Sequence, residues 1–216
     1  MNTSIVWFKT DLRLHDNETL VKAIEQSDEI IPVFCFDDNE FKRTEFGFQK
    51  TGNFRAQFLL ESLKDLDNNL RKIGSGLLIV RGKPEYELFK IAQKYHATKV
   101  FAKKEVAYEE KQTEEAVEKE LWKLKCELKT FSTSTLYHAL DLPFSIKDIP
   151  DVFTNFRKRT EKESQIRDIF SAPKSINSSS NSSGSNSPFG IRKLQVWSNI
   201  NSTEPCVPIV PLHLLK

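Results

Sequence analysis

Short apolar runs alternate with amphipathic segments along the first 135 residues of the chain. The first two runs consist mostly of β-branched and aromatic residues without polar alternation, which is typical of strands buried on both faces. Similar short runs follow at regular intervals. Strands are therefore expected at residues 5–8, 30–36, 77–80, 99–101 and 127–131.

Helices are expected between these strands, because apolar residues there recur at steps of three to four. The clearest helix covers residues 55–73 and stops before a pair of glycines. An earlier helix follows Asp16 or Asn17, either of which can cap it, and a later one has Pro84 near its first position. This alternation predicts an α/β fold, a doubly wound five-stranded parallel sheet, within residues 1–135.

The pattern changes after residue 135. An extension at residues 136–170 begins without a helical period and then predicts a helix over 151–169. Residues 171–190 are rich in Ser and Asn, and we expect a flexible linker there because they cannot bury enough apolar surface to fold. Residues 191–216 contain three prolines and are too short for a core, so we expect the unstructured tail of a truncated chain.

Composition changes this picture little. The 216 residues carry a formal net charge of +2, with 38% hydrophobic and 29% charged residues, which describes a soluble globular protein without strong attraction to nucleic acid or membrane. Cys35, Cys126 and Cys206 are too widely spaced to signal a disulfide framework or a zinc site. No apolar segment has membrane-spanning length and no targeting peptide precedes the first strand, so a cytoplasmic or nuclear location is expected.

Charged and aromatic side chains follow three of the expected strands. Because ligands bind beyond the carboxyl ends of parallel strands, this edge of the sheet is the expected binding site. A carboxylate and several cations beside aromatic rings can hold a flat polar heterocycle, with the carboxylate accepting hydrogen bonds from ring nitrogens and an exocyclic amine. The candidates are Lys9, Asp11 and Arg13 after the first strand, Phe36 and Asp37 after the second, and Lys103, Lys104 and Glu105 after the fourth.

Structural roles are the alternative for the same side chains. Asp11 and Arg13 can form an ion pair or caps that stabilise their loop, and Glu105 can be a carboxylate at a helix N-terminus, where the dipole favours it. The sequence has no glycine-rich phosphate loop, nucleophile elbow, zinc-protease motif or metal-spaced set of Cys and His. No standard signature therefore assigns a reaction.

Five stretches carry a family resemblance. They are VWFKTDLRLHDNETL at 6–20, FGFQKTGNFRAQFLLESLKDL at 46–66, RGKPEYEL at 81–88, KEVAYEE at 104–110 and STLYHALDLPFSIKDIPDVFTNFRKRTEK at 134–162. Together they closely resemble the photolyase and cryptochrome family, and the second and fifth are distinctive of its DASH-type cryptochromes. The sequence departs from the family at Lys9 and Thr10, where Arg-Asn is frequent, and at Gln49, where Pro is common.

The resemblance implies the N-terminal α/β antenna domain of a two-domain photoprotein. In the DASH branch such a domain usually holds 5,10-methenyltetrahydrofolate near a cleft with a helical domain that carries FAD. Absorbed blue light passes to reduced flavin, which repairs cyclobutane pyrimidine dimers, preferentially in single-stranded DNA, or serves a photoreceptor. By similarity Glu105 matches the glutamate that hydrogen-bonds the pterin, and Lys104 and the loop after the first strand line the same cleft.

The same resemblance implies that the part of the family that binds FAD is missing from this chain. No flavin-binding, DNA-binding or electron-transfer position can be assigned, so the chain alone is expected to be inactive in repair and to bind folate weakly. One alternative is a nucleotide- or partner-binding α/β module without light chemistry, although no glycine-rich turn follows the first strand. Another alternative is a nonfunctional fragment. Exposed apolar surface and aggregation would indicate this case.

Overall fold

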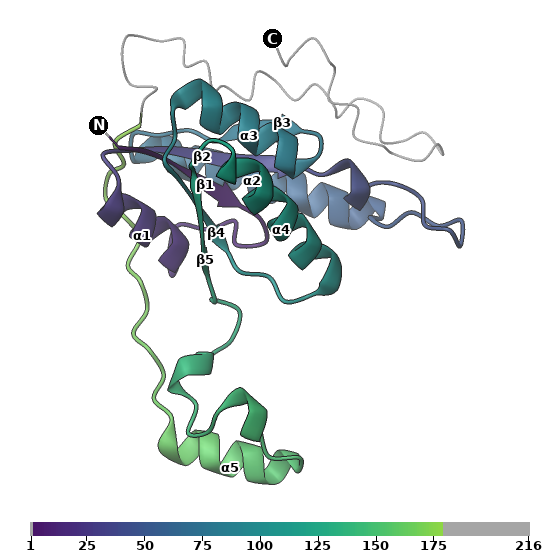
Figure 1. Cartoon of the computed structure of the whole chain (residues 1–216), viewed down its shortest axis with the longest axis vertical. Coiled ribbons are helices and arrows are strands. Elements are labelled where there is room, and N and C mark those ends of the chain that lie inside the picture. The colour runs from purple at the N-terminus through teal and green to yellow at the C-terminus, as the bar shows by residue number, and fades with distance from the viewer. Residues whose placement is uncertain (1, 179–216) are drawn as a thin grey trace.

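Five parallel strands form the central sheet of the structure (Figure 1), a computed structural model that describes residues 2–178. The strands follow one another in the sheet in the order β3-β2-β1-β4-β5, and each neighbouring pair is parallel. Their bounds are β1 Thr3–Phe8, β2 Glu29–Phe36, β3 Leu78–Arg81, β4 Lys99–Lys103 and β5 Glu127–Phe131. The predicted five-stranded parallel sheet is confirmed.

Helices cover both faces of the sheet, which confirms the doubly wound arrangement. Helices α1 (Glu18–Gln26) and α2 (Asn53–Lys72) pack on the face that carries Val6 and Phe8. Helices α3 (Pro84–Tyr95) and α4 (Tyr108–Trp122) pack on the opposite face, against Ile5 and Trp7. Because successive side chains of a strand point to opposite faces, β1 is buried on both sides, as its continuous apolar run predicts.

Asn17 caps α1 and is thus the correct one of the two expected caps. Its side-chain oxygen accepts a hydrogen bond from the backbone N–H of Leu20 at 3.0 Å. This bond satisfies one of the N–H groups that the start of a helix leaves without a partner in the helix. The preceding residue, Asp16, has a φ of 50°, in the left-handed region that Asp tolerates better than most residues.

The extension after β5 leaves the sheet and then returns to it (Figure 1). It contains two short 3-10 turns, η2 (Ala139–Asp141) and η3 (Ile146–Asp148), and the helix α5 (Phe153–Glu163). This helix is shorter than the expected 151–169, because the backbone becomes extended at Ser164 and runs back toward α1. We call residues 164–178 the return segment.

The return segment joins the hydrophobic core through Ile176. The backbone N–H of Ile176 donates to the carbonyl oxygen of Ile73 at the end of α2, at 2.9 Å. The backbone N–H of Ile30 in β2 donates to the carbonyl oxygen of Asn177, also at 2.9 Å. The Ile176 side chain is only 4% exposed and joins the core cluster between the sheet and helices α1 and α2.

The structure therefore differs from the expected flexible linker over residues 171–178. A single isoleucine among Ser and Asn residues leaves no periodic signal, so composition alone suggested disorder. The rest of the expected linker, 179–190, and the expected tail, 191–216, lie outside the described residues. Within residues 2–178, no helix combines the length and the apolar character needed to cross a membrane.

Candidate functional site

A cavity of about 940 Å³ lies beyond the carboxyl ends of β1 and β2. It is lined by the ends of these strands, by a loop at residues 39–52, by α2, by the start of α3 and by residues 105–116 around the start of α4. Pockets for small molecules commonly have volumes of roughly 300–1,000 Å³. The cavity is therefore large enough for a ligand at the sheet edge that the sequence identifies.

Glu105 lies between β4 and α4, and its side chain is 13% exposed at the cavity wall. Its Oε1 atom accepts a hydrogen bond from the Thr10 hydroxyl at 3.0 Å and lies 3.7 Å from Lys103 Nζ. Lys103 Nζ in turn donates to the Thr10 hydroxyl at 2.7 Å. Strands β1 and β4 are neighbours in the sheet, and their adjacent ends bring the three side chains together.

Glu114 of α4 connects Lys9 with Glu105. Lys9 Nζ lies 2.5 Å from Glu114 Oε1 and 4.8 Å from the centroid of the Trp7 ring. The same Glu114 oxygen accepts a hydrogen bond from the backbone N–H of Glu105 at 2.9 Å. The side chains of Lys9 and Glu114 are 13% and 12% exposed, so their opposite charges compensate each other in a largely shielded position.

Phe36 and Asp37 line the cavity where β2 ends. The Phe36 ring is buried and meets the Phe34 ring edge-on, with centroids 5.0 Å apart. The Asp37 carboxylate accepts a hydrogen bond from the backbone N–H of Asn39 at 2.8 Å and so caps the short helix η1 (Asp38–Glu40). Burial raises the pKa of the Asp37 carboxyl above its usual value, despite the opposing effect of the bond from Asn39.

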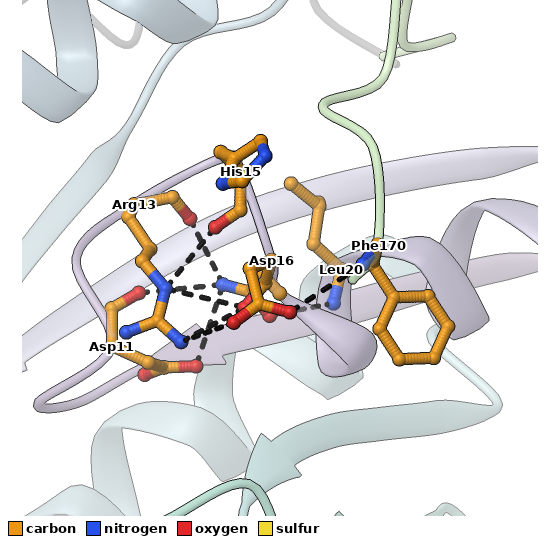
Figure 2. Close-up of polar contacts among 7 residues, drawn as sticks. Asp11, Arg13, His15, Asp16, Leu20 and Phe170 are labelled. Carbon is orange, nitrogen blue, oxygen red and sulfur yellow. Dashed lines mark hydrogen bonds and ion pairs between the residues drawn. The ribbon is translucent and has the colours of Figure 1, made fainter. Parts of the chain in front are cut away.

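Asp11 and Arg13 hold the loop after β1 and do not line the cavity (Figure 2). Asp11 is buried, and its carboxylate accepts a hydrogen bond from the backbone N–H of Lys9 at 3.1 Å. The Arg13 guanidinium donates to the carbonyl oxygens of His15 and Asp16, at 3.1 and 2.9 Å. Both side chains contact their own loop, which is the arrangement that the structural alternative describes.

Lys104 also lies outside the cavity lining, with an exposed side chain. Its backbone N–H donates to the carbonyl oxygen of Phe131 at 2.7 Å, beside the end of the β4–β5 pairing. The cavity thus brings together four of the eight candidate residues, Lys9, Phe36, Asp37 and Glu105, and its lining leaves out Asp11, Arg13, Lys103 and Lys104. Ligand contacts for all eight stay predictions.

Lys50 forms an ionic contact in the cavity wall that sequence reasoning missed. Its Nζ atom donates to Glu40 Oε1 at 2.9 Å and to the carboxylate of Glu109 on α4. Burial alone would lower the pKa of Lys50, but the two hydrogen-bonded carboxylates raise it, and the bond from Lys50 lowers the pKa of Glu109. Both shifts favour the charged pair, so Lys50 fastens the loop at residues 39–52 to α4.

No local sequence pattern predicts this contact, because Lys50 and Glu109 are 59 residues apart. The sequence offered two indirect signals, the aromatic and charged residues at 39–54 and the family-like stretch at 46–66. Both suggest that the loop is held in place, and neither identifies the partner that holds it.

Comparison with known proteins identifies the family. The family model for DNA photolyase matches residues 4–175. Cryptochrome DASH of Synechocystis sp. is 43% identical over 175 residues, which cover 81% of this chain and 36% of that protein. Cryptochrome DASH of Danio rerio is 39% identical over 208 residues, which cover 94% of this chain and 38% of that protein. The chain therefore spans little more than a third of the length of these relatives.

Solved structures share the fold. The crystal structure of a cryptochrome from Synechocystis sp. PCC6803 aligns with a TM-score of 0.80 and 42% identity, over 84% of this chain and 38% of that chain. An archaeal photolyase from Sulfolobus tokodaii aligns with a TM-score of 0.69 at 24% identity, over 82% of this chain and 38% of that chain. This chain belongs to the DNA photolyase family, in its DASH cryptochrome branch, and has the fold of the family's N-terminal α/β domain.

Proposed function

We propose that this chain is the antenna domain of a DASH-type cryptochrome and that its chromophore is 5,10-methenyltetrahydrofolate. The observation that carries the proposal is the shielded carboxylate of Glu105 at the edge of a cavity of about 940 Å³. The cavity lies beyond the carboxyl ends of a parallel sheet, where open α/β sheets bind their ligands. Its volume is sufficient for a folate.

The residues present fit the pterin end of a folate. The pterin ring carries an exocyclic amine beside a ring N–H, and both groups are hydrogen-bond donors. An ionised carboxylate is an acceptor only, so Glu105 is suited to these two groups. The rings of Phe36 and Phe41, 5.9 Å apart, contribute apolar surface to the same cavity. A flat heterocycle that stacks or packs on aromatic rings and presents hydrogen-bond donors at its edge is thus the ligand that this lining favours.

The bound folate would supply the absorption of light, while the residues of this chain hold and orient it. Flavin chemistry, repair of cyclobutane pyrimidine dimers in single-stranded DNA and photoreceptor signalling belong, in this proposal, to a longer protein with a helical FAD domain. The DASH relatives that support this view are far longer than the aligned part. We therefore assign no catalytic residue to this chain and expect no repair from it alone.

Exposed apolar side chains on the extension support such a helical partner. The large ones are Leu136, Leu140, Ile146, Ile149, Val152, Phe153, Ile166 and Ile169. Exposed apolar surface concentrated on one segment is typical of an interface. In our proposal the helical domain covers it in the longer protein. In the isolated chain the same surface favours self-association, which is the behaviour that the fragment alternative predicts.

Titration of the full chain with 5,10-methenyltetrahydrofolate, followed by absorption, tests the proposal. We expect saturable binding by the unmodified chain. Glu105→Gln should lower the affinity on the order of 10- to 100-fold, since hydrogen bonds to a charged group contribute about 1.5–3 kcal/mol. Glu118→Gln is the matched control, because Glu118 is an exposed carboxylate of α4 outside the cavity lining, and it should bind like the unmodified chain.

Two outcomes would count against the proposal. An unchanged affinity in Glu105→Gln would remove Glu105 from the binding site. Saturable binding of ATP without binding of folate would favour a nucleotide-binding module instead. Since both titrations use the same protein sample, the two ligands can be compared directly.

A further inference from the structure

The Glu105 carboxylate is held through one of its two oxygens. Oε1 receives the hydrogen bond from Thr10, and Lys103 Nζ lies 3.7 Å from the same atom. Among residues 2–178, no hydrogen bond or ion pair reaches Oε2. The protein therefore engages one side of the carboxylate and leaves the other available as an acceptor.

The direction of the Thr10 hydroxyl proton follows from its two neighbours. An ammonium group has only donors, so Thr10 Oγ1 must accept the 2.7 Å hydrogen bond from Lys103. An ionised carboxylate has only acceptors, so the single hydroxyl proton of Thr10 is directed to Glu105 at 3.0 Å. The three groups thus form an ordered chain of hydrogen bonds, in which Lys103 donates to Thr10 and Thr10 donates to Glu105.

Glu114 pairs with Lys9 and also holds the main chain of Glu105. Its Oε1 atom accepts both from Lys9 and from the backbone N–H of Glu105, so the position of the Glu105 main chain and the charge of Lys9 are fixed by the same group. Within residues 2–178, the ion pair of Lys9 is formed with Glu114 and that of Glu105 with Lys103. The two carboxylates are similarly buried but have distinct roles. Glu114 binds Lys9 and the Glu105 main chain, whereas Glu105 keeps one oxygen that can accept further hydrogen bonds.

We propose that Thr10 is a positioning residue for ligand binding: it fixes Glu105 Oε1 so that Oε2 accepts hydrogen bonds from the donor edge of a pterin. This inference rests on the proposed function and adds to it a residue that the family resemblance does not assign. Thr10 occupies a position where the sequence departs from the Arg-Asn pair that is frequent in the family. Removing the hydroxyl should leave Glu105 present but free to rotate.

A double-mutant cycle in the full chain tests the inference. Thr10→Val replaces the hydroxyl by a methyl group of similar size, and we expect folate affinity to fall roughly 3- to 10-fold, as for one lost hydrogen bond. Thr10→Ser restores the hydroxyl and should bind within about twofold of the unmodified chain. In a Glu105→Ala background, Thr10→Val should cause no further loss, because Thr10 acts through the carboxylate.

Thermal unfolding of each variant without ligand separates positioning from folding. A merely structural role for Thr10 would lower the melting temperature and would weaken binding equally with and without the Glu105 side chain. Additive losses in the double variant, or an unchanged affinity in Thr10→Val while Glu105→Ala binds weakly, would overturn the inference and leave the proposed function standing. An unchanged affinity in Glu105→Ala would overturn both.

Discussion

The backbone N–H of Asp16 donates to the carbonyl oxygen of Phe170 at 2.7 Å, and so joins residues that are 154 positions apart. The backbone N–H of Phe170 lies 3.4 Å from the Asp16 carboxylate, which Arg13 also approaches at 3.5 Å (Figure 2). Lys9 and Thr10, at the start of the same loop, line the cavity. One loop therefore connects the candidate site with the return segment.

Replacing Ile176 with Ala should lower the free energy of unfolding by about 2–4 kcal/mol, because a buried side chain is lost and a void is left behind. Ile166→Ala is the matched control, since Ile166 lies in the same segment but is 56% exposed, against 4% for Ile176. The control should change stability by less than about 0.5 kcal/mol. Equilibrium unfolding in urea measures both variants, and equal stabilities would contradict the packing of the return segment.

The contact between Lys50 and Glu109 should weaken in acid. Lys50 lowers the pKa of Glu109, so the stabilisation is complete above the usual carboxyl value of 4.5 and is lost as the pH falls through the lower value of the folded chain. On the alkaline side the pKa of Lys50 is raised above its usual 10.5, so the contact persists throughout the neutral range.

Limited proteolysis of the loop at residues 39–52 measures this pH dependence. Glu109→Gln weakens the ionic contact at every pH, so we expect the variant to be cleaved faster than the unmodified chain near neutral pH. The ratio of the two rates, taken at the same pH with the same protease, should approach one in acid. A ratio that does not change with pH would show that the ionic contact does not hold the loop.

Alkylation of Cys126 should be slow in the folded chain. Burial raises the pKa of its thiol from 9.0 to about 11, and since only the thiolate reacts, the rate below pH 9 should fall about 100-fold from ionisation alone. Burial also raises the pKa of the Cys35 thiol. Iodoacetamide labelling with peptide mass spectrometry can follow both residues, with the urea-unfolded chain as control. Rapid labelling without urea would show that the surrounding strands open readily.

The candidate site should prefer a pterin to a flavin. A pterin edge presents two adjacent donors, whereas the corresponding flavin edge places one ring N–H between two carbonyl oxygens, which an ionised carboxylate repels. Glu105→Gln introduces an amide donor and should therefore bring the affinities for the pterin and for the flavin closer together. Competitive titration with 5,10-methenyltetrahydrofolate and riboflavin measures this ratio, and equal affinities in the unmodified chain would argue against Glu105 as the selecting group.

The sheet and its helices could be predicted because their signals are local in sequence, as the apolar run of β1 and the cap at Asn17 illustrate. The site could be predicted in part, since β1 and β4 deliver Lys9 and Glu105 to the same edge. The sequence could not show whether Asp11 and Arg13 stabilise their loop or bind a ligand, because the same charged residue types serve both roles. Only their hydrogen bonds distinguish the two roles.

The burial of Ile176 means that the α/β unit is discontinuous in sequence. Residues 3–131 supply the sheet and its helices, and Ile176 of the return segment completes the core on the side of α1 and α2. The part between them, with α5, is therefore an insertion whose two ends are tied to the same body (Figure 1). Lengthening such an insertion adds little to the entropic cost of holding its two ends together. The extension can thus diverge in sequence while the cavity at the candidate site keeps its shape.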